Sequence, residues 1–182
     1  MDDFEVLYDL LRGEALAPVE NLRGRPKTIT LEESGQQGYV LKLLGTPNDT
    51  IAFKADKFPP PECLFQNSRH ECKRADYVVI ARQRNKKWIV YIEMKSGTGK
   101  TAEIKQQLRG AKCLVTYCRA IVQEFWEEHG FLRGFAERFV GVREIRIAKR
   151  STREPRAPVH DNPDDMLTMS APKGIIHFRK LL

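Results

Sequence analysis

The chain contains few cysteines and no long apolar segment. Each of these features argues against a class of protein, the first against a zinc protein and the second against a membrane protein. Its 182 residues include four cysteines, none of which forms a C-x-x-C pair. A zinc site built from Cys63, His70, Cys72 and a further ligand fits no usual ligand spacing, so reduced and mostly buried thiols are the better interpretation. No apolar run approaches the roughly 20 residues that a membrane helix needs, so we expect no association with a membrane.

The sequence also lacks a signal peptide, internal repeats and the familiar nucleic-acid-binding modules. The N-terminal residues from Met1 to Glu5 are acidic, without the basic and apolar regions of a signal peptide. The sequence contains no internal repeat, no low-complexity tract, and no zinc finger or helix-turn-helix. We therefore expect a cytoplasmic protein, and the length favours a single domain over residues 1–182.

Positive charge is present in excess and is unevenly distributed. The formal net charge is +7. One basic cluster lies in a polar break between two apolar runs and consists of Arg82, Arg84, Lys86 and Lys87. A second cluster consists of Arg143, Arg146, Lys149, Arg150, Arg153 and Arg156. Binding of a polyanion and a solvated basic surface explain these clusters equally well from charge alone.

Hydrophobic periodicity predicts an α/β protein. Helices are expected over residues 2–12, 31–44 and 101–129; a capping-box pattern, Thr30-x-x-Glu33, marks the second, and an apolar stripe from Ile104 to Phe125 marks the third. Strands are expected over residues 50–55, 75–81, 88–95, 139–148 and 175–178, and loops over 17–28, 57–73 and 151–174. This order suggests one mixed sheet with helices packed on it. The expected core spans about residues 30–148, with a helix and loop over 1–29 before it and a final strand over 175–182.

The two central strands are expected to form a hairpin that turns at Arg84 and Asn85. Partners in an antiparallel pair have residue numbers that add to a constant, which places Asp76 opposite Glu93 and Lys95 one diagonal step away. Side chains alternate along a strand, so the face that carries Glu93 and Lys95 also carries Ile89 and Tyr91, and the opposite face carries Trp88, Val90, Ile92 and Met94. A strand that is apolar on both faces is covered on both sides, so the charged groups need partners there.

Two carboxylates and a lysine at adjacent strand ends suit the hydrolysis of a phosphodiester. Asp76 and Glu93 can hold Mg²⁺, which prefers oxygen ligands, with help from the backbone carbonyl of Met94. The metal lowers the pKa of a bound water, and Lys95 can orient that water or stabilise charge in the transition state. A structural ion pair across an ordinary hairpin is the alternative explanation of the same residues.

The segments Ala75-Asp76 and Glu93-Met94-Lys95, followed by a long helix, resemble the motif of the PD-(D/E)xK, or restriction-endonuclease-like, nuclease superfamily. The resemblance departs from the motif at Ala75, where the proline of the name is absent. It implies a core of a helix, a three-stranded meander, a helix and a strand, in a restriction-endonuclease-like fold whose central mixed sheet is flanked by helices. It also implies a nuclease that uses Mg²⁺ or Mn²⁺, favours DNA over RNA, binds the metal through Asp76 and Glu93, and uses Lys95 on the attacking water.

The resemblance suggests two further site residues. Many members of the superfamily add an acidic residue from the first core helix, for which Glu33 is the first candidate and Glu32 the second. Both could equally be capping or solvated residues. Some relatives place a glutamine on the helix after the Glu-x-Lys strand, and Gln107 falls on the inward stripe of the expected helix. Gln107 could contact the active site or the nucleic-acid backbone, or it could simply lie at the edge of the core.

Contacts with nucleic acid are expected from the basic break and from the start of the long helix. The candidate residues are Arg82, Arg84, Lys86, Lys87 and Lys100. Residues 97–101 resemble the end of a Walker A loop, but Met94 stands where that motif needs a glycine. A non-catalytic nucleic-acid-binding or assembly protein that keeps the fold is the alternative function. The basic loops would allow a homodimer, although nothing in the sequence requires one.

Overall fold

The computed structural model describes residues 1–182 except for 22, 25, 34–38, 97–99, 144–158 and 172. Within these bounds the chain forms two α-helices, α1 (Asp3–Leu10) and α2 (Thr101–Phe125). The strands are β1 (Val19–Glu20), β2 (Thr28–Glu32), β3 (Val40–Leu44), β4 (Asp49–Lys54), β5 (Tyr77–Gln83), β6 (Lys86–Lys95), β7 (Ala136–Arg143), β8 (Leu167–Ser170) and β9 (Ile175–His177). Short 3₁₀ helices occur at η1 (Gly13–Ala15), η2 (Ala55–Lys57), η3 (Pro163–Asp165) and η4 (Phe178–Leu181).

The strands form two mixed sheets, which confirms the α/β class and corrects the expectation of a single sheet. The larger sheet has the order β4-β5-β6-β7-β8, with β4, β5 and β6 as an antiparallel meander and β6, β7 and β8 parallel. Neighbouring parallel strands need a long crossover connection, and α2 lies in the connection from β6 to β7. The smaller sheet has the order β1-β2-β3-β9, and β3 and β9 are its parallel pair.

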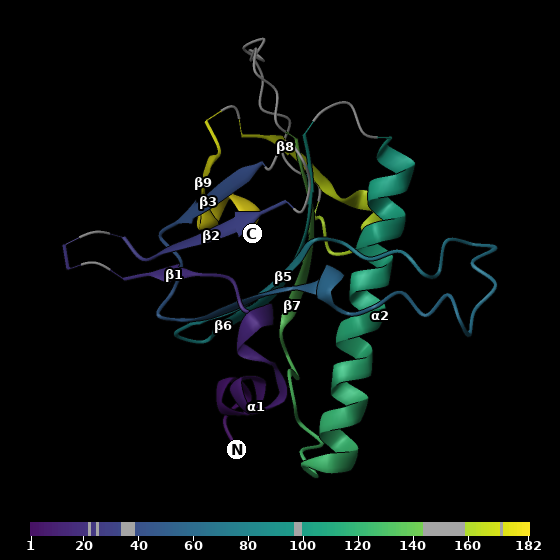
Figure 1. Ribbon diagram of the computed structural model, residues 1–182. Helices are drawn as coiled ribbons and strands as arrows, with labels where there is room; N and C mark the ends of the chain where they lie inside the picture. The colour runs from purple at the N-terminus through teal and green to yellow at the C-terminus, as the bar shows by residue number, and fades with distance from the viewer. Residues whose placement is uncertain (22, 25, 34–38, 97–99, 144–158, 172) are drawn as a thin grey trace.

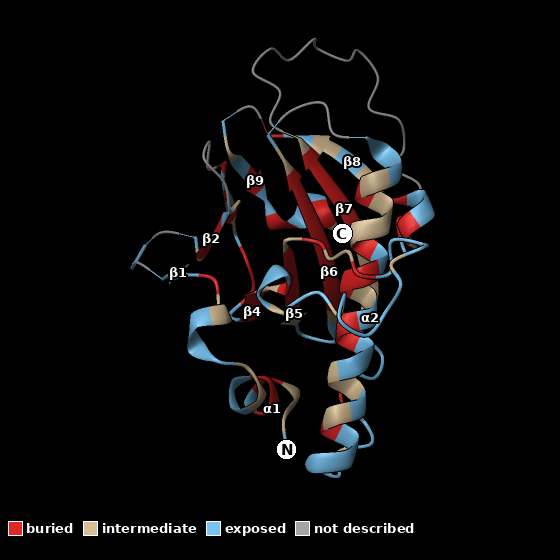
Figure 2. Ribbon diagram, turned by 45° about the vertical axis from the view of Figure 1, so that its right-hand side comes forward, coloured by how far each residue is buried: buried red, intermediate tan, exposed pale blue. Residues whose placement is uncertain are grey.

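The larger sheet lies between helix α2 and the smaller sheet (Figure 1), and each of its faces packs in a hydrophobic layer. On one face, Ile89 and Tyr91 of β6 pack with apolar residues of α1 and α2. On the other face, Val90, Ile92 and Met94 pack with the smaller sheet. Strand β6 is therefore covered on both sides, as its sequence predicts, and Figure 2 shows β6 and β7 largely buried. Any charged side chain on β6 must find its partners within the protein.

The prediction of a helix over residues 31–44 is wrong. This part of the chain contains the antiparallel strands β2 and β3. The side chains of Leu31, Leu41 and Leu43 are fully buried and pack in the layer between the two sheets. Alternating apolar residues of this kind have the period of a strand, and this period outweighs the helix-capping pattern at Thr30.

Most of the other predicted elements are present with shifted ends. Elements α1, β4, β5, β6 and β9 lie where a helix or strand is predicted. Helix α2 ends at Phe125, whose side chain is 79% exposed, so the inward stripe stops at Val122. Strand β7 begins earlier than predicted, and β8 lies inside the predicted loop 151–174. The predicted strand residues 144–148 and the first part of that loop, 151–158, fall outside the described residues.

None of the described helices is both long enough and apolar enough to cross a membrane. The four cysteines are free, and the prediction of buried thiols holds for Cys72 but is wrong for Cys63 and Cys113, which are exposed.

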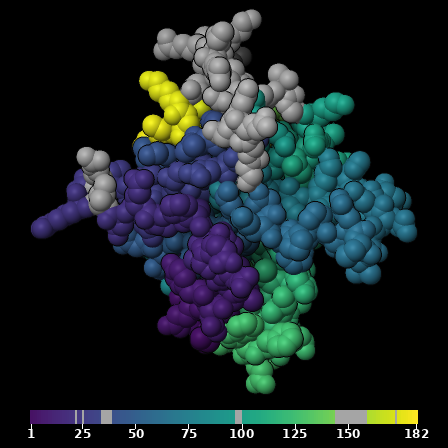
Figure 3. Space-filling view, in the orientation of Figure 1, coloured from purple at the N-terminus to yellow at the C-terminus, as the bar shows by residue number. Residues whose placement is uncertain are grey.

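The segment between η2 and β5 projects beside α2 and returns to the sheet immediately before Asp76 (Figures 1 and 3). The Arg74 side chain contacts residues at both ends of this segment. It donates hydrogen bonds to the carbonyls of Pro59 at 3.4 Å and Cys72 at 3.0 Å, and its guanidinium lies 5.0 Å from the centre of the Phe58 ring. These contacts hold the residues before Asp76 against the body of the protein.

Candidate active site

The hairpin of β5 and β6 brings Asp76 and Glu93 together in the predicted register. The ladder begins with Tyr77 opposite Ile92, so Asp76 comes opposite Glu93. The Met94 N–H donates to Asp76 Oδ2 at 2.6 Å, and the Asp76 N–H donates to Glu93 Oε2 at 3.2 Å. Each carboxylate is thus held by the backbone of the neighbouring strand.

Lys95 completes this group from the end of β6. Its Nζ lies 2.6 Å from Glu93 Oε1 in an ion pair. The Glu93 side chain is fully buried, whereas that of Lys95 is 23% exposed. The lysine therefore connects the buried carboxylate to the surface. We name Asp76, Glu93 and Lys95 the strand-end triad.

Burial strongly shifts the titration of both carboxylates. Burial, and secondly the charge of Asp76, raise the pKa of Glu93 to about 8, although Lys95 lowers it. Burial also raises the pKa of Asp76 to about 6, against the hydrogen bond from Met94 and the charge of Lys95. The ionised pair is thus unfavourable near neutral pH, and a nearby cation would stabilise it.

Glu33 lies near the triad but not on a helix, which corrects its predicted setting. It follows Glu32, the last residue of β2. The Tyr77 hydroxyl accepts a hydrogen bond from the Glu32 N–H at 2.8 Å and donates one to the Glu32 carbonyl at 3.0 Å. The charge of Glu33 contributes to the raised pKa of Asp76, after burial as the main cause. Glu33 Oε2 is buried and makes no hydrogen bond to the described residues.

Asp56 is a further acidic residue near the triad that sequence reasoning missed. It lies in η2, directly after β4, and the preceding Ala55 N–H donates to the Asp76 carbonyl at 2.9 Å. The charge of Asp56 also helps to raise the pKa of Asp76, although burial is the larger cause. The signal in the sequence was an acidic residue just past the first strand of the meander. Pairing of β4 with β5 brings that strand end next to Asp76.

Gln107 lies on the side of α2 that faces the segment before Asp76. Residues three and four apart share a helix face, and two such neighbours of Gln107, Glu103 and Gly110, contact Lys73. The Glu103 carboxylate lies 3.0 Å from Lys73 Nζ, and Gly110 packs directly on the Lys73 backbone. Gln107 Oε1 is buried without a hydrogen-bond partner among the described groups. Gln107 as a whole is half-buried, and its predicted role stays a prediction.

The donor set suits a hard cation only in part. In the described part of the chain, no group of three or more histidine, cysteine, aspartate or glutamate side chains is arranged to hold a metal ion. Mg²⁺ commonly uses one or two carboxylates and keeps several waters, and the half-buried Asp76 and the fully buried Glu93 can supply these carboxylates. The unpaired Glu33 Oε2 is a further oxygen donor nearby. Met94 contributes its N–H to Asp76, and metal binding by its carbonyl stays a prediction.

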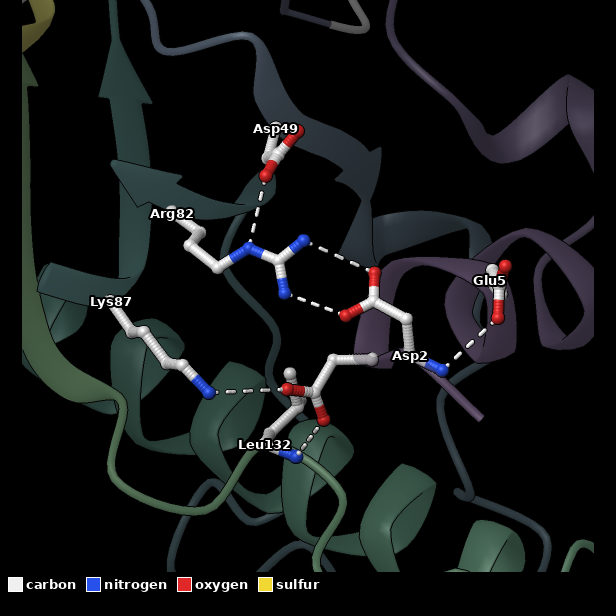
Figure 4. Close-up of polar contacts among 7 residues, drawn as sticks. Asp2, Glu5, Asp49, Arg82, Lys87 and Leu132 are labelled. Atoms are coloured by element: carbon white, nitrogen blue, oxygen red, sulfur yellow. Dashed lines mark hydrogen bonds and ion pairs between the residues drawn. The ribbon is translucent and has the colours of Figure 1, made fainter. Parts of the chain in front are cut away.

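Most of the predicted basic contact residues lie far from the triad. Arg82 is six residues along β5 from Asp76, which corresponds to about 20 Å of extended chain. Figure 4 shows the Arg82 guanidinium between two carboxylates, with Asp2 at 2.6 Å and Asp49 at 3.0 Å. Lys87 lies 3.7 Å from the Asp3 carboxylate in the same group. The charges of Arg82 and Lys87 are therefore balanced within the fold.

The other predicted contact residues are more accessible. Arg84 and Lys86 are exposed at the tip of the hairpin, and Lys100 is exposed immediately before α2. Lys100 is the predicted contact residue closest in sequence to Lys95, although residues 97–99 between them lie outside the described part. Binding of nucleic acid by these three residues stays a prediction.

We expect Arg82→Met to lower the free energy of unfolding by about 1–2 kcal/mol without a specific effect on nucleic acid. The variant loses two partly exposed ion pairs, which contribute about 0.2–1 kcal/mol each. It also loses the contact of the guanidinium with the Phe4 ring, whose centre is 4.9 Å away and which contributes about 0.5–1 kcal/mol. Urea unfolding at low salt measures the change, with the exposed Lys86→Met as the matched control. Equal stability of the two variants would contradict a structural role for Arg82.

The chain was also compared with known proteins. No protein-family model, no curated protein and no solved structure matches it.

Proposed function

We propose that this protein is a metal-dependent nuclease that hydrolyses phosphodiester bonds of nucleic acid, with DNA favoured over RNA. The observation that carries the proposal is the strand-end triad, in which a half-buried Asp76 carboxylate and a fully buried Glu93 carboxylate each accept a hydrogen bond from the neighbouring strand, and Glu93 also pairs with Lys95. A purely structural ion pair would need one carboxylate. The second one raises the pKa of the first, so it has an electrostatic cost that a metal ion would offset.

The order of elements supports the same proposal. The meander β4-β5-β6, the crossover helix α2 and the parallel strand β7 follow the order that the PD-(D/E)xK resemblance implies. The first core helix of that family has no counterpart at residues 31–44, where β2 and β3 lie instead. Membership of the superfamily and the restriction-endonuclease-like fold are therefore part of the proposal.

In the proposed reaction, Asp76 and Glu93 hold Mg²⁺ or Mn²⁺, with Glu33 as a candidate for an additional contact. The ion, when bound, would lower the pKa of an attacking water and complement the charge of the phosphate. The Lys95 ammonium orients the water and stabilises negative charge that develops during the attack. The Met94 N–H keeps Asp76 in place throughout, because it donates to the carboxylate oxygen at 2.6 Å.

Cleavage assays on plasmid DNA and on RNA test the proposal. We expect the wild-type protein to cut with Mg²⁺ or Mn²⁺ and to be inactive in EDTA, and we expect Asp76→Ala and Lys95→Ala to abolish cutting. Glu124→Ala, which changes an exposed residue of α2, is the control that should keep wild-type activity. Binding without cleavage by the wild type would favour the alternative of a non-catalytic nucleic-acid-binding protein. Cleavage that survives both triad substitutions would reject the proposed site.

A further inference from the structure

Arg143 ends strand β7 directly beside Lys95. The parallel ladder of β6 and β7 pairs Glu93 with Gly141 and Lys95 with Arg143. Partners in a ladder share a face of the sheet, and adjacent strands lie about 4.8 Å apart. Lys95 and Arg143 thus place two cations next to each other on the face that α2 covers. Gly141 contributes no side chain between them and Glu93.

The hydrogen bonds of Arg143 leave part of its guanidinium unsatisfied. Its Nη2 donates to Thr101 Oγ1 at 3.0 Å, in the first turn of α2. Its Nε is buried and has no hydrogen-bond partner in the structure as described. No carboxylate of the described residues lies within ion-pair distance of Arg143, whereas Arg82, Arg109 and Arg119 each have at least one. Among the described residues, Arg143 is therefore anchored by a neutral hydroxyl and has no counter-ion.

An arginine in this state is suited to bind an anion with two oxygens. A buried N–H without an acceptor is unfavourable, and a phosphate or carboxylate can satisfy the edge of a guanidinium with two parallel hydrogen bonds. The position beside Lys95, at the edge where the triad is located, is the place where a backbone phosphate would lie during cleavage. The contact with Thr101 would hold the guanidinium in a fixed orientation.

We propose that Arg143, oriented by Thr101, binds a backbone phosphate of the substrate next to Lys95. The inference rests on the proposed function, because it takes the substrate to be a nucleic acid. It adds a substrate-binding residue that acts before the chemical step. Arg143 holds the strand in place by its phosphate and does not activate the attacking water.

Direct binding separates this inference from the nuclease activity. The probe is a fluorescent DNA duplex, titrated in EDTA so that no cleavage occurs, at several salt concentrations. We expect Arg143→Met to weaken binding about tenfold and to reduce the slope of log K against log [salt] by about 0.9, the value for one phosphate contact. Arg143→Lys should keep the slope but regain only part of the affinity, because an ammonium cannot bind with two parallel hydrogen bonds.

Arg138→Met is the matched control, because it removes the same charge from the opposite face of the same strand. In cleavage assays Arg143→Met should raise KM more than it lowers kcat. Wild-type affinity and salt slope in Arg143→Met, or an equal loss in Arg138→Met, would overturn the inference while leaving the nuclease proposal intact. A wild type that binds but never cuts, with binding that still depends on Arg143, would reject only the nuclease proposal. A wild type that neither binds nor cuts would reject both.

Discussion

The variant Glu93→Gln is expected to be inactive and, without metal at pH 8, more stable than the wild type. Glutamine keeps the shape of the fully buried side chain and removes its charge. Without that charge the site loses a metal ligand, and we expect cleavage to fall about 1,000-fold or more, as a loss of several kcal/mol of transition-state stabilisation implies. The same substitution also removes a buried negative charge, which the metal-free protein compensates only in part.

The sign of the stability effect follows from the direction of the pKa shifts. Burial first, and then the Asp76 charge, raise the pKa of Glu93 from 4.5 to about 8. A carboxyl whose pKa is raised by folding contributes stability below its unfolded pKa, and that contribution is lost as pH rises through the folded pKa. The metal-free wild type should therefore become less stable between about pH 4 and pH 8. We expect Glu93→Gln to reduce this decline and to exceed the wild type by about 2 kcal/mol at pH 8.

Urea unfolding at pH 5 and pH 8, in EDTA and in Mg²⁺, measures these effects. Mg²⁺ should stabilise the wild type at pH 8, because it binds the folded protein through the ionised pair, and should have little effect on Glu93→Gln. The exposed Glu124→Gln controls for a change of charge alone. A Glu93→Gln variant that is less stable than the wild type at pH 8 would mean that Lys95 already compensates the buried charge. In that case the structural ion pair becomes the better explanation of the triad.

The parts of the site that the sequence predicts are those that depend on local periodicity. The position of one hairpin turn determines which residues face each other along β5 and β6, so Asp76, Glu93 and Lys95 could be placed together without any knowledge of the rest of the chain. The two apolar faces of β6 could be predicted in the same way, because side chains alternate between the two faces of a strand with a period of two residues. A single correct register therefore accounts for most of the correct prediction.

The parts that were missed depend on contacts between residues far apart in sequence. Asp56 and Arg143 come close to the triad through the pairing of β4 with β5 and of β7 with β6, and the local sequence around each residue does not show this proximity. Arg82 was predicted to contact nucleic acid because it lies in a basic run, but its partners Asp2 and Asp49 come from α1's cap and from β4. Charge read along the sequence cannot show which cations are already paired in the fold.

We expect Gly110→Ala to be the most destabilising small substitution near the site, lowering the free energy of unfolding by about 3 kcal/mol or more. In an exposed helix the same change is favourable by about 1 kcal/mol. Here a Cβ on Gly110 would lie 1.7 Å from the Lys73 carbonyl oxygen and 2.7 Å from its carbon. Both are backbone atoms, so no side chain can rotate away, and either α2 or the segment before Asp76 must move.

Displacement of this segment would also reach the strand-end triad. Lys73 is three residues before Asp76, so a shift of its backbone would disturb the contacts of Asp76 with Glu93 and Met94. Urea unfolding and circular dichroism separate the two possible results, because a folded Gly110→Ala protein with lost cleavage indicates local displacement, and a loss of helical signal indicates global unfolding. Gly130→Ala is the control, since its added Cβ would have no atom within 4 Å and its stability should stay within about 0.5 kcal/mol of the wild type. A Gly110→Ala protein that is stabilised, as in an exposed helix, would show that α2 does not pack on Lys73 and that the helix has no part in positioning Asp76.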